Sequence, residues 1–397
     1  MTNKNYVLLI LILGSLTALA PFSIDMYLPG FPAIARNLNT TVAQVALSLS
    51  SFFIGISAGQ LLYGPLLDRF GRKKPLYIGL VIYIIASLGC VFATSIDVLI
   101  VLRFVQAIGS CAATVTAVAM VRDLFPVKDS AKVFALLMLV LGVSPMIAPT
   151  LGGYITTTFG WHSIFLILMG IGIFNLFASW LWLPEVYKAD ISISLKPKPI
   201  ITNFIEVFRQ PHFYTYALTG ALAFAGLFAY ISGSPLLFMD IFKVSEQTYG
   251  WIFALLSVGF IGSSQLNIFL LKKFKSEQII LLAMIAQVIT ILFFLVGGIN
   301  GWFGLYTTIF LLFKFLCCLG FISPNASALT LAPFSKNAGS ASALMGAIQM
   351  GLGALASMGI GFFDIKSIVP MLAIMSVCSV FALAVLITGR VQIKKAA

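Results

Sequence analysis

Residues 64–74 read Gly-Pro-Leu-Leu-Asp-Arg-Phe-Gly-Arg-Lys-Lys, a short basic segment between two long apolar stretches. Gly71 permits a tight turn, and the three basic residues after it oppose passage through a bilayer. The flanking stretches, residues 42–67 and 75–95, are each long enough to cross a hydrocarbon core of roughly 30 Å as a helix. The segment therefore predicts a cytoplasmic turn between two membrane-spanning helices.

The rest of the chain repeats this pattern. Hydrophobic residues make up 60% of the 397 residues and charged residues only 9%, too few charges to cover a soluble surface. So much apolar surface also excludes a disordered chain, and the apolar stretches are too long for the strands of a membrane barrel. We therefore expect an all-α integral membrane protein with twelve transmembrane helices. We place the spans at residues 6–29, 42–67, 75–95, 97–121, 132–157, 162–183, 213–239, 248–271, 277–299, 303–324, 339–363 and 367–389.

The distribution of Lys and Arg sets the topology. If the N-terminus is cytoplasmic, 19 of these residues fall in cytoplasmic segments and 3 on the opposite side, with Arg103 and Lys314 inside spans. This asymmetry predicts cytoplasmic N- and C-termini in a bacterial cytoplasmic (inner) membrane. The net charge of +12 is then explained by basic loops that face anionic lipid headgroups, so we expect the lipid bilayer and not nucleic acid as a partner.

The N-terminal apolar run has the small-residue sequence Ala18-Leu19-Ala20, which is typical of a signal-peptide cleavage site. The run continues past this point to Asp25, however, and we expect it to be retained as the first span. The longest polar segment, residues 184–212, divides the chain into two predicted six-helix bundles, residues 1–183 and 213–397. This arrangement favours a transporter with a substrate cavity between its two halves.

Several motifs resemble known families. Residues 64–74 resemble the G-x-x-x-D-R-x-G-R-[KR] signature of the major facilitator superfamily, and Arg103 to Gln106 resemble its R-x-x-Q-G motif, with Ala107 in place of the final Gly. Residues 148–153 resemble the antiporter motif G-P-x-x-G-G, with Ala148 in place of the first Gly. The Bcr/CflA group of drug:proton antiporters, the bicyclomycin-resistance type, is similar in three further segments: Ser23 to Pro29, Met120 to Pro126 and Ala338 to Ser342.

The resemblance implies two mechanical sites. A cytoplasmic gate would latch the two halves together when the transporter faces outward, and its expected residues are Gly64, Asp68, Arg69, Gly71, Arg72 and Asp123. Asp123 either pairs with Arg72 or Arg69 or is simply solvated.

The antiporter motif of span five would form a tight seam between spans, and the alternative is plain helix packing. The residues of this motif are Pro145, Pro149, Gly152 and Gly153.

Asp25 is the one acid within a predicted span rather than at its edge. A carboxyl group in hydrocarbon is costly and marks a functional site by default, and the resemblance implies that it carries the coupling proton. Asp25 lies 19 residues after Tyr6, which is roughly 28 Å along a helix and nearly the full thickness of a hydrocarbon core of roughly 30 Å. The alternative is therefore that Asp25 is a carboxylate at the outer interface of the membrane. Arg103 would control the protonation of Asp25 by approaching or withdrawing, or would be a structural partner of backbone carbonyls and polar groups of span one.

The substrate cavity is less defined by sequence. Lys314 either snorkels to the interface or places a charge in the cavity. Polar or aromatic side chains in the spans are the candidates for the lining: Tyr27, Gln60, Tyr63, Tyr230, Lys314, Asn325 and Gln349.

The predicted function is export of small, mostly apolar drugs or metabolites in exchange for protons, by alternating access. The alternative is an exporter or importer of one endogenous metabolite or siderophore. An enzyme is not expected, because the sequence has no H-E-x-x-H, G-x-S-x-G or G-x-x-x-x-G-K-[ST] pattern. The five cysteines have no metal-ligand spacing. We expect protons as the coupling ion, no cofactor, no metal and a monomeric protein.

Overall fold

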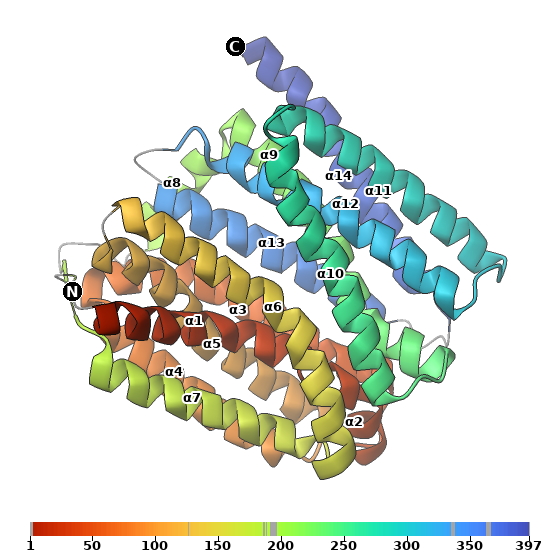
Figure 1. The fold of residues 1–397 in the computed structure, drawn as a ribbon, viewed down its shortest axis with the longest axis horizontal. Coiled ribbons are helices and arrows are strands. Elements are labelled where there is room, and N and C mark those ends of the chain that lie inside the picture. Colours follow the sequence, from red (N-terminus) through yellow and green to blue (C-terminus); the bar gives the residue numbers. More distant parts are fainter. Residues whose placement is uncertain are drawn as a thin grey trace.

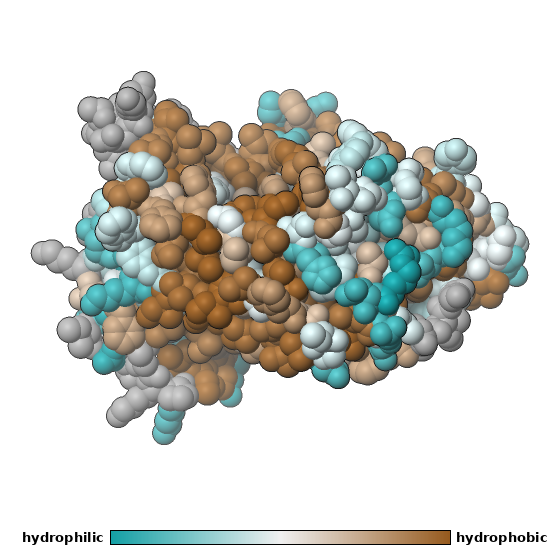
Figure 2. Space-filling view, turned by 90° about the horizontal axis from the view of Figure 1, so that it is seen from below, coloured by the Kyte–Doolittle hydropathy of each residue, from teal (hydrophilic) through white to brown (hydrophobic). Residues whose placement is uncertain are grey.

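The computed structural model describes residues 3–125, 127–185, 187, 189–190, 197–334, 338–362 and 367–396. All regular secondary structure within these ranges is helical, and twelve helical segments are long and apolar enough to cross a membrane. The predicted all-α membrane fold with twelve spans is therefore confirmed. Figure 2 shows the corresponding surface, a broad hydrophobic band between more hydrophilic ends.

Two groups of helices lie side by side (Figure 1). The first group comprises α1 (Asn3–Asp25), η1 (Leu28–Gly30), α2 (Phe31–Asn37), α3 (Val42–Phe70), α4 (Lys73–Val91), α5 (Ile96–Leu124), α6 (Val127–Phe159) and α7 (His162–Trp182). The second comprises α9 (Pro211–Pro235), η2 (Leu236–Ile241), α10 (Glu246–Leu270), α11 (Ser276–Ile299), α12 (Leu305–Leu331), α13 (Ala338–Gly361) and α14 (Val369–Ala396). Helix α8 (Pro197–Phe208) lies between them in the chain.

Local sequence signals set the helix boundaries. Thr41, Ser95 and Ser245 each precede a helix and accept a hydrogen bond from the backbone N–H three residues later, at 3.2–3.3 Å. Such caps satisfy one of the free N–H groups at a helix start. Gly71 adopts φ +84°, a left-handed conformation that glycine tolerates, and ends α3 at the predicted turn.

The first span and the linker differ from the sequence prediction. Helix α1 ends at Asp25, but η1 and α2 continue in helical conformation to Asn37, beyond the predicted end at residue 29. Asp25 therefore lies inside the first span and not at its outer edge. Helix α8 occupies the second part of residues 184–212, the polar segment that divides the two predicted bundles.

The two bundles meet along two seams. Helix α3 packs on α13, and α6 packs on α10. The contacts run toward the ends that the Lys and Arg distribution assigns to the periplasm: Leu47 of α3 meets Gly361 of α13, and Thr157 of α6 meets Gln247 of α10. At the opposite end, which the same distribution assigns to the cytoplasm, the bundles enclose a cavity, so the structure is inward-facing: closed at the periplasmic end and hollow at the cytoplasmic end.

Candidate functional site

A cavity of about 740 Å³ lies between the bundles at their cytoplasmic end. Its wall comprises residues between 60 and 68 of α3, Arg72 in the turn after α3, and residues between 114 and 123 of α5, 199 and 204 of α8, and 339 and 346 of α13. The volume lies in the range of small-molecule sites. Apolar side chains such as Val115, Val118 and Phe204 alternate with polar ones such as Asn203 and Ser340. The charged residues Asp68, Arg72, Arg122 and Asp123 lie in the same wall.

Of the seven predicted cavity residues, Gln60 alone lines this cavity, and its Oε1 is buried with no hydrogen-bond partner among the described residues. Gln349 lines a narrow crevice within the second bundle. Asn325 donates to Asn267 Oδ1 at 2.8 Å inside the same bundle, and Lys314 is exposed on α12. The reason is geometric: polar residues of one helix point to several sides, and the sequence does not specify which side faces the cavity.

The three predicted cavity tyrosines are all buried away from the cavity. Tyr27 shares a hydrogen bond with Ser48 at 2.9 Å, and Tyr63 packs within the first bundle, with its side chain 5% exposed. Tyr230 of α9 is 1% exposed, and its ring stacks on Phe253 with ring centroids 5.8 Å apart. Tyr230 instead belongs to the seam between the bundles.

Asp25 is 4% exposed and is the last residue of α1. The chain directly after it packs closely on α6, because a Cβ atom at Gly152 would overlap the Met26 carbonyl oxygen. Gly152 lies seven residues before the end of α6, which is roughly 10 Å of helix from the periplasmic boundary. The element directly after Asp25, η1, packs on α9 and α10 of the second bundle. Asp25 is thus a deeply buried acid at the junction of the two bundles.

Arg103 is also fully buried, but it faces the interior of the first bundle. Its guanidinium donates to the Ser23 carbonyl oxygen at 2.7 Å and to Gln106 Oε1 at 2.5 Å. The same group lies over the rings of Tyr27 and Phe52, at 4.3 and 4.2 Å from their centroids. Such stacking stabilises a desolvated cation.

Among the described residues no ion pair joins Arg103 to Asp25, whereas Arg72 forms ion pairs with Asp68 and Asp123. The structural alternative for Arg103, bonding to a backbone carbonyl of span one, is the one that the structure contains. The bond to the Ser23 carbonyl fixes the end of α1 two residues before Asp25. Arg103 is therefore bonded to the backbone of α1 close to Asp25 in the chain.

The proline- and glycine-rich part of α6, which includes Pro145 and Pro149, forms the seam against α10. A Cβ at Gly153 would come within 2.6 Å of the Glu246 carbonyl oxygen, and one at Gly250 within 2.8 Å of Thr150 Cα. Because these neighbours are backbone atoms, side chains cannot move aside to relieve the contact. Glycine at these positions allows the close approach of the two bundles.

The other seam contains a chain of buried hydroxyl groups. Ser357 of α13 shares hydrogen bonds with Ser50 of α3 at 2.6 Å and with Ser232 of α9 at 2.5 Å. Toward the cavity, Ser57 donates to the Ala347 carbonyl oxygen at 2.8 Å. If the seam opened without admitting water, these hydroxyl groups would lose their hydrogen-bond partners. The contacts therefore help to hold the two bundles together.

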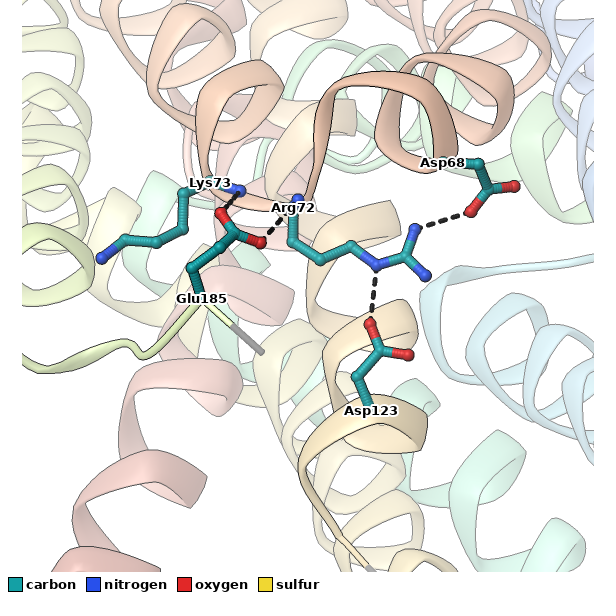
Figure 3. A network of polar contacts seen from close by, with 5 residues as sticks. All are labelled: Asp68, Arg72, Lys73, Asp123 and Glu185. Carbon is teal, nitrogen blue, oxygen red and sulfur yellow. Dashed lines mark hydrogen bonds and ion pairs between the residues drawn. The ribbon is translucent and has the colours of Figure 1, made fainter. Parts of the chain in front are cut away.

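The basic turn after α3 forms a network at the cavity wall (Figure 3). Arg72 donates from Nη1 to Asp68 and from Nε to Asp123, both at 2.7 Å, so the predicted pairing of Asp123 with Arg72 is present. Burial lowers the pKa of Arg72, but the hydrogen bonds and charges of the two carboxylates outweigh it and raise this pKa above its ordinary value. Arg72 is therefore permanently charged.

Glu185, just after α7, completes this network and was not predicted. Its carboxylate accepts from the backbone N–H groups of Arg72 and Lys73 at 3.1 and 3.0 Å. Figure 3 shows the Lys73 ammonium group pointing away, so Glu185 binds the start of α4 through the backbone. A carboxylate is favourable there because a helix N-terminus carries partial positive charge. Tyr187 also packs on the Arg72 guanidinium, at 3.7 Å from its ring centroid.

Comparison with known proteins agrees with this architecture. Residues 13–358 match the profile of the Major Facilitator Superfamily. The chain belongs to this superfamily. Twelve membrane-spanning helices and bacterial relatives make it a multi-pass protein of the bacterial cytoplasmic membrane. It is a transporter, as its superfamily is, and not an enzyme.

Its relatives cover nearly the full length. The bicyclomycin resistance protein homolog of Haemophilus influenzae is 30% identical over 96% of this chain and 95% of that protein. The multidrug resistance protein MdtL of Escherichia coli O139:H28 is 31% identical over 91% and 94%. The resemblance to bicyclomycin-resistance transporters is thereby confirmed. Among solved structures, a D-xylose-proton symporter superposes with a TM-score of 0.75 at 14% identity, covering 96% of this chain and 97% of that one, which supports the fold.

Proposed function

We propose that this transporter exports small, mostly apolar molecules in exchange for protons, by alternating access of a central cavity. The observation that carries the proposal is the buried carboxyl of Asp25 at the junction of the two bundles. The names of the relatives, bicyclomycin resistance and multidrug resistance, support drugs as cargo. The cavity of about 740 Å³ at the cytoplasmic end supports loading of cargo from the cytoplasm.

Burial of Asp25 links protonation to conformation. A charged carboxylate is far more costly to bury than a neutral carboxyl group. A proton taken up from the periplasm neutralises Asp25 and allows the α6–α10 seam to close beside it. Release of the proton toward the cytoplasm restores the charge, which favours the conformation in which Asp25 contacts periplasmic water. Cargo that binds the inward-facing cavity then leaves on the opposite side from the proton.

The test is proton-driven export by an Asp25→Asn variant. Asparagine keeps the size and the polarity of the side chain but cannot release a proton. In an efflux-deficient bacterium, the wild-type protein should protect against some members of a panel of antibiotics and dyes, and the equally expressed variant should not. Asp97→Asn, at the exposed start of α5, is the matched control and should protect as the wild type does.

Full proton-driven export by Asp25→Asn would refute the assignment of Asp25. Absence of protection by well-expressed wild-type protein would instead favour transport of one endogenous metabolite or siderophore, and uptake would then be measured beside export.

A further inference from the structure

Helix α8 is not one of the twelve spans, yet it forms part of the cavity wall. Ile200, Asn203 and Phe204 of this helix line the cavity. Residues at the spacing i, i+3 and i+4 lie on one face of a helix. The neighbouring Ile201 is 53% exposed and is not part of this wall. One face of α8 is therefore turned toward the cavity, and Ile201 lies on another face.

The second bundle holds α8 in this position. The helix packs on α9 and α13 (Figure 1). Asn203 Nδ2 donates a hydrogen bond to Ser340 Oγ, in the first turn of α13, at 2.9 Å. Val207 is 2% exposed and belongs to an apolar cluster with Phe213 of α9 and Ala341 of α13. Helix α8 is thus a packed part of the second bundle and not a loose connection.

We infer that the cavity face of α8 is a cargo-binding surface, with Ile200 and Phe204 as specificity-determining residues. This inference rests on the proposed export through the cavity. The amide group of Asn203 is bonded to Ser340 and holds the helix in place. The two apolar side chains are therefore what α8 presents to cargo. They fit the apolar or aromatic part of a cargo molecule, because burial of apolar surface is favourable and a phenyl ring adds stacking.

The position of α8 gives this surface a role in one conformation. Val115 and Val118 of α5 bring the first bundle to the same cavity, so cargo inside it lies between the two bundles. Under alternating access the cytoplasmic ends of the bundles approach each other in the outward-facing conformation, and the space beside α8 is lost. Contacts with Ile200 and Phe204 then raise the affinity for cargo in the inward-facing conformation alone. Such a difference favours binding from the cytoplasm and release on the other side.

The test measures uptake of three dyes into inside-out membrane vesicles energised by respiration. Ethidium, rhodamine 6G and Nile red have apolar ring systems that differ in size, shape and charge. Two matched pairs of variants are compared: Ile200→Ala with Ile201→Ala, and Phe204→Ala with Phe208→Ala. Within each pair the substitution and the helix are the same, but Ile201 and Phe208, which are 53% and 40% exposed, lie outside the cavity wall.

For an exported dye, Ile200→Ala and Phe204→Ala should raise the half-saturating concentration by about 3- to 30-fold, the value of a partly buried apolar contact, and retain the maximal rate. Ile201→Ala and Phe208→Ala should stay near the wild type. Dyes of different shape should be affected unequally, because each covers the α8 face to a different extent. In a background without native cysteines, the exported dye should slow maleimide labelling of Ile200→Cys and not of Ile201→Cys.

The outcomes separate the two proposals. A well-expressed wild type that transports none of the three dyes would contradict the proposed export and overturn this inference with it. Wild-type transport that is unchanged in Ile200→Ala and Phe204→Ala would overturn the role of α8 alone. Equal changes in both members of a pair, or one common fold-change for every dye together with a lower unfolding temperature, would mean a packing role and would also overturn it.

Discussion

Replacing Gly250 by alanine should shift the transporter away from the inward-facing conformation. The added Cβ would stand 2.8 Å from Thr150 Cα, 2.9 Å from the Pro149 carbonyl oxygen and 3.1 Å from the Thr150 nitrogen. Carbon atoms prefer separations of roughly 3.5–4.0 Å, so the seam must widen by about half an ångström or more. Overpacking of this kind costs about 1–3 kcal/mol. The ratio of outward- to inward-facing molecules should therefore rise by about 5- to 150-fold.

Gly262→Ala is the control on the same helix. A Cβ at Gly262 meets nothing within 4 Å, while both substitutions gain the same intrinsic helix propensity, about 1 kcal/mol. The assay is the rate at which a membrane-impermeant thiol reagent labels Val118→Cys, in the cavity wall, from the cytoplasmic side. Labelling should slow in the Gly250→Ala background and not in the Gly262→Ala background. Equal labelling rates in the two backgrounds would refute the reasoning that the α6–α10 seam closes the periplasmic side.

Two further predictions concern the other seam and the basic turn. Ser357→Ala removes the hydroxyl that joins α3 to α9, and the loss of two hydrogen bonds should destabilise the closed periplasmic side by about 1–3 kcal/mol. The thiol assay should again report less cytoplasmic access, whereas Ser379→Ala, which loses a bond within α14 only, should leave access unchanged. Glu185→Gln weakens the charged cap of α4 and should reduce the free energy of unfolding by about 1 kcal/mol. Thermal unfolding in detergent measures this effect, with Glu206→Gln on the exposed side of α8 as the control; an equal change in both variants would contradict it.

The proposed roles of Asp25 and Arg103 differ because their helices turn them in opposite directions. Arg103 is satisfied inside the first bundle by a carbonyl oxygen, an amide and two aromatic faces. Asp25 lies at the end of α1, where the next element, η1, packs on α9 and α10 of the second bundle. A direct charge pair would have held Asp25 ionised. Under the proposed proton exchange, the absence of such a pair among the described residues allows the Asp25 carboxyl to gain and lose a proton as the bundles move.

The sequence by itself determined the twelve spans, the basic turn at residues 64–74 and the resemblance to its superfamily. These features depend on hydrophobicity and charge along the chain, because the membrane selects apolar helices of a given length and retains basic loops on one side. Helix α8 was missed, since its residues lie in a polar, proline-containing segment too short to span. Glu185 was missed because its partners are backbone N–H groups, which no side-chain pattern reveals.

Only the tertiary structure decided which polar side chains meet. Successive residues of a helix point about 100° apart, so a small change in rotation moves a side chain from a cavity to a core or a seam. Ser50 and Ser357 are separated by 307 residues and share a hydrogen bond because α3 packs on α13. The packing of one bundle on the other also determined that Gln60, among the predicted cavity residues, lines the cavity. Contacts between helices far apart in sequence depend on how the surfaces of those helices fit together. The pattern of hydrophobic residues along the chain does not specify this fit.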